Sequence, residues 1–140
     1  MDKFLVVVEC AIEFKEKFLF IKRPKGVHAE GLLSFPGGKV ESEDGKNNND
    51  ILLQAVKREV FEEVGLNLVD PIHFLTSSYF IDSHDVKVLD VIFHCEIKNS
   101  TLEITPSRRE VPEYYWLTVS EVLSHQDAPV WLKHYISLIH

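Results

Sequence analysis

The strongest constraint on the fold is one segment, Ile51 to Val64, that has the periodicity of an amphipathic helix. Asp50 stands before it as a candidate N-cap, and Gly65 stands where a left-handed residue commonly ends a helix. An α-helix turns about 100° per residue, so apolar side chains in one sector share a face that packs on a core. The residues of this face are Leu53, Val56, Val60 and Val64, with Phe61 extending it.

Strand-like runs, apolar and rich in β-branched and aromatic residues, lie on both sides of this helix. They span 4–8, 17–23, 32–35, 72–81, 86–97 and 114–117, with a turn near Lys15 and Glu16. This order predicts an α/β sandwich with a mixed sheet rather than repeated βαβ units, folded as one domain over residues 1–140.

The remaining segments are two helical stretches and one polar connection. A helical turn is expected over 119–123, with Thr118 as a possible cap, and a closing helix over 129–139. The apolar face of that closing helix consists of Val130, Leu132, Tyr135, Ile136 and Ile139. The polar segment from Glu43 to Asp50, with three consecutive Asn, is expected to be a loop.

Three carboxylates form a stripe beside the apolar face of the first helix. Glu59, Glu62 and Glu63 fall within about 100° of one another on the helical wheel. Like charges at these spacings repel each other, so a compensating partner is expected. Arg58 can neutralise one of them, and a divalent cation such as Mg²⁺ or Mn²⁺ would neutralise more. The alternative reading is a solvated acidic surface with no ligand.

A glycine pair precedes this helix by one loop. Gly37 and Gly38 allow backbone to approach a ligand closely. The segment is not a P-loop, because Leu33 occupies the position of that motif's first glycine and Val40 follows Lys39.

The glycine pair and the acidic helix together resemble the Nudix box. Residues 58–66, Arg-Glu-Val-Phe-Glu-Glu-Val-Gly-Leu, match the second half of that motif at every position, and residues 36–41 match its opening. The chain departs from the family in the spacing from Gly38 to Arg58, which is twenty residues instead of the usual fourteen. The extra residues fall in the segment 43–49, and counting back from Arg58 places Asp50 where the family usually has Glu.

The resemblance implies a Nudix-type α/β/α sandwich with a loop-helix-loop catalytic motif. It implies that Glu59 and Glu63 are the main metal ligands, assisted by Glu62 and by a carbonyl near Gly38, and that Arg58 orients the glutamates. The metal would be Mg²⁺, with Mn²⁺ as an alternative. Such ions neutralise a diphosphate and lower the pKa of an attacking water.

A general base is the second catalytic element that the resemblance implies. Glu110, six residues before Trp116, is the expected base, and Glu113 is the alternate. A helix glutamate or the metal alone are the other possibilities.

Four residues are expected to contact a nucleotide. By the resemblance, Arg23 contacts phosphate, and a guanidinium fork suits phosphate. Lys39 is expected to assist, and His28, in the loop before the glycines, is expected to line the base pocket. Asp127 stands where MutT-like members have an Asn that reads the purine edge. An ionised Asp accepts but cannot donate hydrogen bonds, which weakens the case for an oxidised guanine.

The function that the sequence predicts is hydrolysis of a nucleoside diphosphate linked to another group, most simply a nucleoside triphosphate. The alternatives are ADP-ribose or another nucleotide sugar, a dinucleoside polyphosphate, and a non-catalytic nucleotide-binding module. The resemblance is compatible with a monomer or a homodimer.

Composition and charge restrict the partners and the cellular location that we expect for this chain. The net charge of −7 argues against a partner that is a nucleic-acid polymer. No apolar run is long enough for a membrane span, and no signal-peptide pattern is present, so a cytoplasmic location is expected. Cys10 and Cys95 are expected to be buried free thiols in a reducing compartment.

Overall fold

The computed structural model describes residues 1–26, 29–98 and 113–139. Its strands are β1 (Leu5–Phe14), β2 (Lys17–Lys22), β3 (Leu33–Ser34), β4 (Gly37–Lys39), β5 (Ile72–Ile81), β6 (Lys87–Glu96) and β7 (Tyr114–Leu117). Its helices are the 3-10 helix η1 (Ser42–Gly45) and the α-helices α1 (Ile51–Val64), α2 (Val119–Leu123) and α3 (Val130–Ser137). Among the described helices, none is both long and apolar enough to cross a bilayer.

The strands form one mixed sheet with the order β3-β2-β1-β6-β5, while β4 pairs with β1 and β7 pairs with β2. β1 and β6 run parallel at the centre, and their neighbours pair antiparallel. β1 turns directly into β2 through Lys15 and Glu16, which both have positive φ. This is the two-residue connection that suits the twist of a hairpin.

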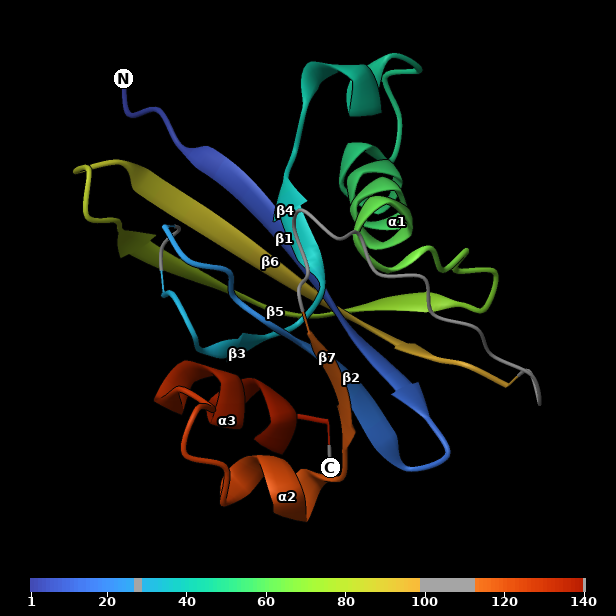
Figure 1. Ribbon diagram of the computed structural model, residues 1–140. Coiled ribbons are helices and arrows are strands. Elements are labelled where there is room, and N and C mark those ends of the chain that lie inside the picture. Colours follow the sequence, from blue (N-terminus) through green and yellow to red (C-terminus); the bar gives the residue numbers. More distant parts are fainter. Residues whose placement is uncertain (27–28, 99–112, 140) are drawn as a thin grey trace.

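Helices cover both faces of the sheet, as Figure 1 shows. On one face α1 buries Ala55, Val56, Val60 and Val64 against β1, β2 and β6. On the other face α2 and α3 bury Val122, Leu132 and Ile136. Each of these side chains is shielded from water, which contributes about 1.5–3 kcal/mol for a large aliphatic residue. The predicted mixed-sheet α/β/α sandwich is therefore confirmed.

Helix boundaries follow the predicted signals, with one exception. Gly65 ends α1 in the left-handed conformation, and the Thr118 side chain caps α2 by accepting from the backbone N–H of Glu121. Asp50 occupies the N-cap position of α1, but its φ is 52° and its side chain makes no capping hydrogen bond. The expected capping role of Asp50 is therefore wrong, because a left-handed cap turns its carboxylate away from the helix amides.

Two predicted core residues lie at the surface. Phe61 is 52% exposed, and Val130 is 78% exposed. Phe61 lies at the edge of the α1 apolar sector, beyond reach of the sheet. Val130 is in the first turn of α3, ahead of the residues that contact the core.

The polar segment after the glycines is also more ordered than expected. Residues 42–45 form η1, in which Asp44 is buried and accepts a hydrogen bond from the backbone N–H of Glu41 at 2.8 Å. After η1, the stretch from Lys46 to Asp50 is exposed throughout.

The two cysteines are free and buried, as predicted. Burial raises the pKa of both thiols, that of Cys95 to about 11. Neither is therefore a reactive thiolate near neutral pH.

Candidate active site

The acidic stripe of α1 faces the strand β4. Because α1 buries its apolar sector against β1, the adjoining sector faces the Gly37–Lys39 backbone. Glu63 is only 6% exposed, whereas the Glu62 side chain is 51% exposed. The three predicted carboxylates therefore share one side of the helix but differ strongly in their contact with water.

Gly37 and Gly38 bring backbone directly against two of these carboxylates. The backbone N–H of Gly37 donates to Glu63 Oε1 at 2.6 Å. A Cβ at Gly38 would lie 2.3 Å from a Glu59 carboxylate oxygen, and a Cβ at Gly37 would lie 2.1 Å from the Val8 carbonyl oxygen. Only glycine allows both approaches, which explains the pair at this position.

Arg58 ties the glutamates to the preceding loop. Its Nη1 donates to Glu59 at 2.8 Å and to Glu62 at 3.1 Å, and its Nη2 donates to the carbonyl of Lys39 at 3.0 Å. These contacts offset the repulsion between the carboxylates and fix their direction. The structure thus brings Arg58 together with two of the glutamates that it was expected to orient.

Asp44 is the main partner of Arg58, and sequence reasoning missed it. Its two carboxylate oxygens accept from Nε at 2.7 Å and Nη2 at 2.9 Å in a bidentate pair. The Arg58 hydrogen bonds hold the pKa of Asp44 below its usual range, and the Asp44 hydrogen bond raises the pKa of Arg58. The acidic residue between Gly38 and Arg58 that contacts the arginine is therefore Asp44, not Asp50. Counting forward from Gly38 rather than back across the inserted residues could have found it.

The donor chemistry of this cluster fits a hard divalent cation. Carboxylate oxygens of Glu59, Glu62 and Glu63 and the carbonyl of Gly38 are the ligand types that Mg²⁺ and Mn²⁺ prefer. Within the described part of the chain, no three such side chains already form a converged metal cluster. Two of the glutamates are held by Arg58 instead, so cation binding requires their side chains to turn.

A second group of charges lies on the opposite face of the sheet, beneath α3. Glu9 of β1 and Asp90 of β6 interact as a pair of carboxyls near Arg23. Burial, and next the Asp90 carboxyl, raise the pKa of Glu9, while the charge of Arg23 opposes this shift. Glu9 also pairs across the strands with Gly37, so this group adjoins the α1 site. Sequence reasoning found Arg23 but not the two acids.

The other predicted substrate residues are spread around these two groups. Lys39 has an exposed side chain, and its carbonyl is the group that contacts Arg58. Asp127 precedes α3, where its carboxylate lies 3.6 Å from Lys22 Nζ and its carbonyl accepts from the N–H of Leu33.

The candidate bases are only partly covered by the structure. Glu110, like His28, lies outside the described residues. Glu113 is described, and its carboxylate accepts a hydrogen bond from the Tyr115 hydroxyl.

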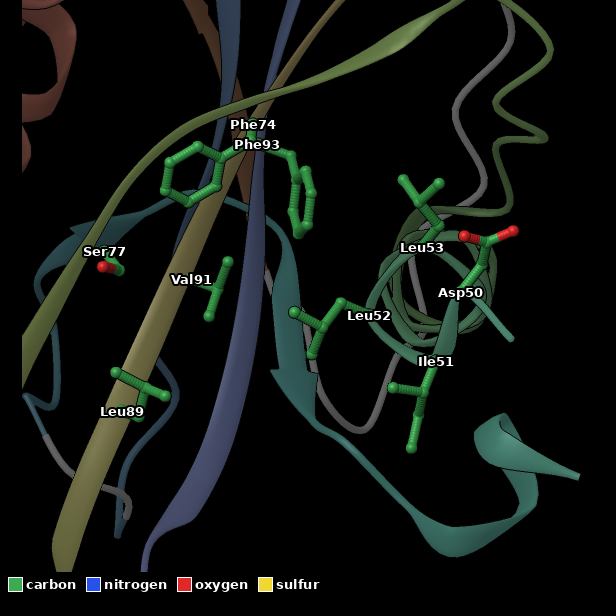
Figure 2. Close-up of a pocket in the computed structure, with 9 residues that line it drawn as sticks. All are labelled: Asp50, Ile51, Leu52, Leu53, Phe74, Ser77, Leu89, Val91 and Phe93. Carbon is green, nitrogen blue, oxygen red and sulfur yellow. The ribbon is translucent and has the colours of Figure 1, made fainter. Parts of the chain in front are cut away.

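An apolar hollow of about 510 Å³ lies between the first turn of α1 and strands β5 and β6 (Figure 2). Leu52 points into it from the helix, and Val91 and Phe93 line it from β6. It lies on the first turn of α1, away from Glu59 and Glu63, and it is lined by apolar side chains almost throughout. It is therefore separate from the acidic site.

Comparison with known proteins agrees with this geometry. The NUDIX domain model matches residues 3–138, so the chain belongs to the NUDIX family. Within that family it is a MutT-like hydrolase that acts on phosphorus anhydrides in nucleoside diphosphate derivatives.

Three relatives illustrate the match. The chain is 29% identical over 128 residues to CTP pyrophosphohydrolase of Escherichia coli K12, covering 91% of this chain and 85% of the relative. The fold is similar to a MutT NUDIX hydrolase from Burkholderia pseudomallei, with a TM-score of 0.80, 20% identity, and coverage of 99% and 100%. It is also similar to the NUDIX domain of Shewanella oneidensis NrtR in complex with ADP ribose, with a TM-score of 0.73, 18% identity, and coverage of 98% and 88%. At these identities the two structures show a shared fold.

Proposed function

We propose that this protein is a Mg²⁺-dependent nucleoside triphosphate pyrophosphohydrolase. The observation that carries the proposal is the packing of Glu59 and Glu63 against the Gly37–Gly38 backbone, with Arg58 holding Glu59. The similarity to an enzyme named for CTP favours a triphosphate substrate.

In this proposal Glu59, Glu63, Glu62 and the Gly38 carbonyl hold the cation. When bound, the cation neutralises the diphosphate oxygens and makes water more acidic. The role of Arg58 is to position the glutamates, because its five donors are directed at carboxylates and a carbonyl of the protein.

Arg23 is the proposed phosphate-binding residue. Arg23 lies near Glu9 of β1. Glu9 pairs with Gly37 of β4, which is the strand that faces the acidic stripe of α1. A guanidinium binds phosphate in a bidentate fashion and remains charged at all relevant pH values. His28 and Lys39 are proposed as weaker contacts to the nucleotide.

A nucleotide sugar is the second candidate substrate, because the NrtR NUDIX domain, which shares this fold, binds ADP ribose. Asp127 does not favour an oxidised guanine over other bases, since its charge is directed toward Lys22.

The proposal is tested by measuring phosphate release from the common nucleoside triphosphates with pyrophosphatase added, and from ADP-ribose and a dinucleoside polyphosphate with a phosphomonoesterase added, because cleavage of the last two gives phosphomonoesters rather than pyrophosphate. We expect turnover of a triphosphate with Mg²⁺ and none with excess EDTA. Glu63→Gln keeps an acceptor for the Gly37 N–H, so it should fold normally and lower kcat by about 10². Glu30→Gln, an exposed carboxylate elsewhere, is the matched control. Turnover of ADP-ribose alone, or full activity in EDTA, would overturn the proposal.

Glu110 is proposed as the general base. Glu110→Gln should lower kcat by roughly 10²–10⁴ and leave KM within a few-fold, because a base acts on water rather than on the nucleotide. The acid limb of the kcat–pH profile should disappear in this variant. Glu113→Gln is the matched comparison, since its carboxylate is already engaged by Tyr115. If Glu113→Gln removes the acid limb and Glu110→Gln does not, the assignment is reversed.

A further inference from the structure

The strand β5 is an edge of the sheet, and among the described strands it pairs only with β6. Its ten residues contain no Asp, Glu, Lys, Arg or Pro, although 26% of the chain is charged. An edge strand presents a row of unpaired N–H and C=O groups, which proteins commonly protect with charges, prolines, bulges or short length. Of these devices β5 has one, a bulge between Phe74 and Thr76. The outer edge of β5 is therefore open to pairing with another strand.

Large apolar side chains are exposed along this edge. Phe74 is 63% exposed, and Tyr79 and Ile81 are each 53% exposed. Phe4, which is itself exposed, packs edge-on against Tyr79 with the ring centroids 5.9 Å apart. The apolar surface continues into the hollow beside α1, which Phe74 helps to line (Figure 2). Contiguous apolar surface of this kind marks a site of contact with another molecule.

The area of this surface fits a dimer interface. A whole aromatic side chain presents about 150–250 Å², so the exposed fractions of these residues and of Phe80 amount to roughly 400–500 Å². A standard interface buries about 800 Å² on each partner, of which a little over half is apolar. The exposed side chains therefore supply the apolar share of one such interface, and the backbone edge with its polar side chains supplies the rest.

The side chains of β5 are arranged symmetrically about Ser77. Counted along the paired strand β6, Phe74 and Tyr79 lie two positions to either side of Ser77, because the bulge takes up one residue. Ile72 and Ile81 lie four positions to either side. A two-fold axis through Ser77, perpendicular to the sheet, therefore places Phe74 opposite Tyr79 and Ile72 opposite Ile81 of a second copy. Both are apolar cross-strand pairs of the kind that stabilises a sheet.

We propose that β5 pairs antiparallel with β5 of a second copy of this chain, so that one continuous sheet runs through a homodimer. Charge favours a second copy as the occupant of this edge. Each chain carries a net charge of −7, so two copies repel unless the surface that they share is uncharged, as β5 is. A small apolar molecule in the hollow would leave Tyr79 and Ile81 uncovered, because neither residue lines it. The dimer is independent of the proposed reaction.

Sedimentation of the full chain over a concentration series up to about 100 µM tests for the dimer, since interfaces of this size have dissociation constants of micromolar or below. We expect a particle of twice the chain mass of 16.2 kDa. The dimer should strengthen at higher salt, which screens the repulsion between the two copies. Amide hydrogen exchange along β5 should slow as the dimer forms, because the outer N–H groups become paired.

Substitutions at the Phe74–Tyr79 pair test the register. Phe74→Glu/Tyr79→Glu places like charges opposite each other, so this variant should stay monomeric. Phe74→Lys/Tyr79→Glu places opposite charges there, and two such pairs should lower the dissociation constant by roughly 10-fold or more relative to the first variant. Val130→Glu makes a matched change at an exposed residue of α3 and should remain dimeric. If either double variant fails to fold, Ile81→Glu at the end of the strand should give the monomer.

Four outcomes would contradict the dimer or its register. A wild type that is monomeric at every concentration rules out the dimer. In that case a hydrophobic dye whose fluorescence is lost in Phe74→Glu would assign the surface to a different apolar partner. Dimers that persist in Phe74→Glu/Tyr79→Glu, or that are lost equally in Val130→Glu, place the interface elsewhere. Equal weakening by the two double variants shows that Phe74 and Tyr79 do not face each other.

Discussion

Asp44 and Arg58 form the central charge pair of the acidic site. The Asp44 side chain is 3% exposed and that of Arg58 is 23% exposed, so solvent screens the pair only weakly. Arg58 also contacts Glu59 and Glu62, so Asp44 acts on those glutamates through the arginine. A residue outside the proposed set of cation ligands thus sets the geometry of residues within that set.

The Asp44–Arg58 pair predicts a pH-dependent stability. Because the pKa of Asp44 is lowered in the folded state, its contribution is fully present above the unfolded aspartate pKa of about 3.9. That contribution is lost as pH falls through the lower folded-state pKa. Asp44→Asn should reduce the free energy of unfolding by about 1.5–3 kcal/mol at neutral pH, the range for a hydrogen bond to a charged group.

Urea unfolding of the wild type and Asp44→Asn from pH 7 down to below pH 3 measures this effect. The gap between the two proteins should stay constant to about pH 5 and close as Asp44 takes up its proton. Asp85→Asn, an exposed aspartate, controls for the loss of charge. A gap that is the same at every pH would show that Asp44 acts only through packing.

At the level of single residues, the sequence predicted the charged side chains that lie together on one helix. It did not predict the residues that only the tertiary fold brings next to them. Arg58 and its neighbouring glutamates are visible because helical periodicity orders them locally. Asp44 was missed because inserted residues separate it from Arg58. Asp90 was missed because only the parallel pairing of β1 with β6 places it beside Glu9.

Among the elements, the short strand β4 provides the backbone against which the glutamates of α1 pack. Its two glycines pair with β1 on one side and face α1 on the other. A Gly-Gly dipeptide has no side-chain pattern, so the sequence indicated close backbone approach but not a strand. The long periodic elements α1 and β5 were predicted with the bounds that the structure has.

The two glycines should respond differently to the same substitution. In Gly37→Ala the new Cβ would meet the Val8 carbonyl, which is backbone and cannot move without disturbing β1. We expect a loss of at least about 3 kcal/mol or a failure to fold, as for severe overpacking. In Gly38→Ala the Cβ would meet the end of the Glu59 side chain, which can rotate away.

Gly38→Ala should therefore change the unfolding midpoint little and weaken Mg²⁺ binding, because Glu59 is displaced. Thermal melting and a metal titration of both variants separate the two effects. Equal destabilisation by the two substitutions would mean that Glu59 is held as rigidly as the backbone of Val8.

At the scale of the whole molecule, charged groups lie on both faces of the sheet, one beside α1 and the other on the face that α2 and α3 cover. The acidic cluster lies between α1 and β4, and the Glu9–Asp90 pair lies on the other face of the sheet, near Tyr135 of α3. The predicted layer architecture followed from the order of periodic segments. The strand order could not be predicted, because pairing β1 with β6 joins distant segments and leaves no local signal.

Cation binding should stabilise the entire fold, because its proposed ligands come together only when α1 and β4 are packed. A ligand that binds only the folded state adds RT ln(1 + [L]/Kd), about 1.4 kcal/mol at ten times Kd. For a domain of this size that raises Tm by roughly 3–7 °C. Scanning calorimetry with increasing Mg²⁺ should show this rise in the wild type and in Glu30→Gln.

The size of the shift in variants assigns the ligands. Glu59→Gln and Glu63→Gln should lose most of the Mg²⁺-dependent rise, while Glu62→Gln, whose side chain is half exposed, should lose less. Arg58 competes for Glu59 and Glu62 when no cation is bound, so weakening its hold should not abolish the rise. Arg58→Lys keeps the positive charge but removes the planar guanidinium group that binds Asp44 in a bidentate pair. This variant should therefore have a lower Tm without Mg²⁺ and should retain a Mg²⁺-dependent increase in Tm. If Tm is independent of Mg²⁺ in the wild type, or if Glu63→Gln responds like the wild type, the cation is not held by this helix.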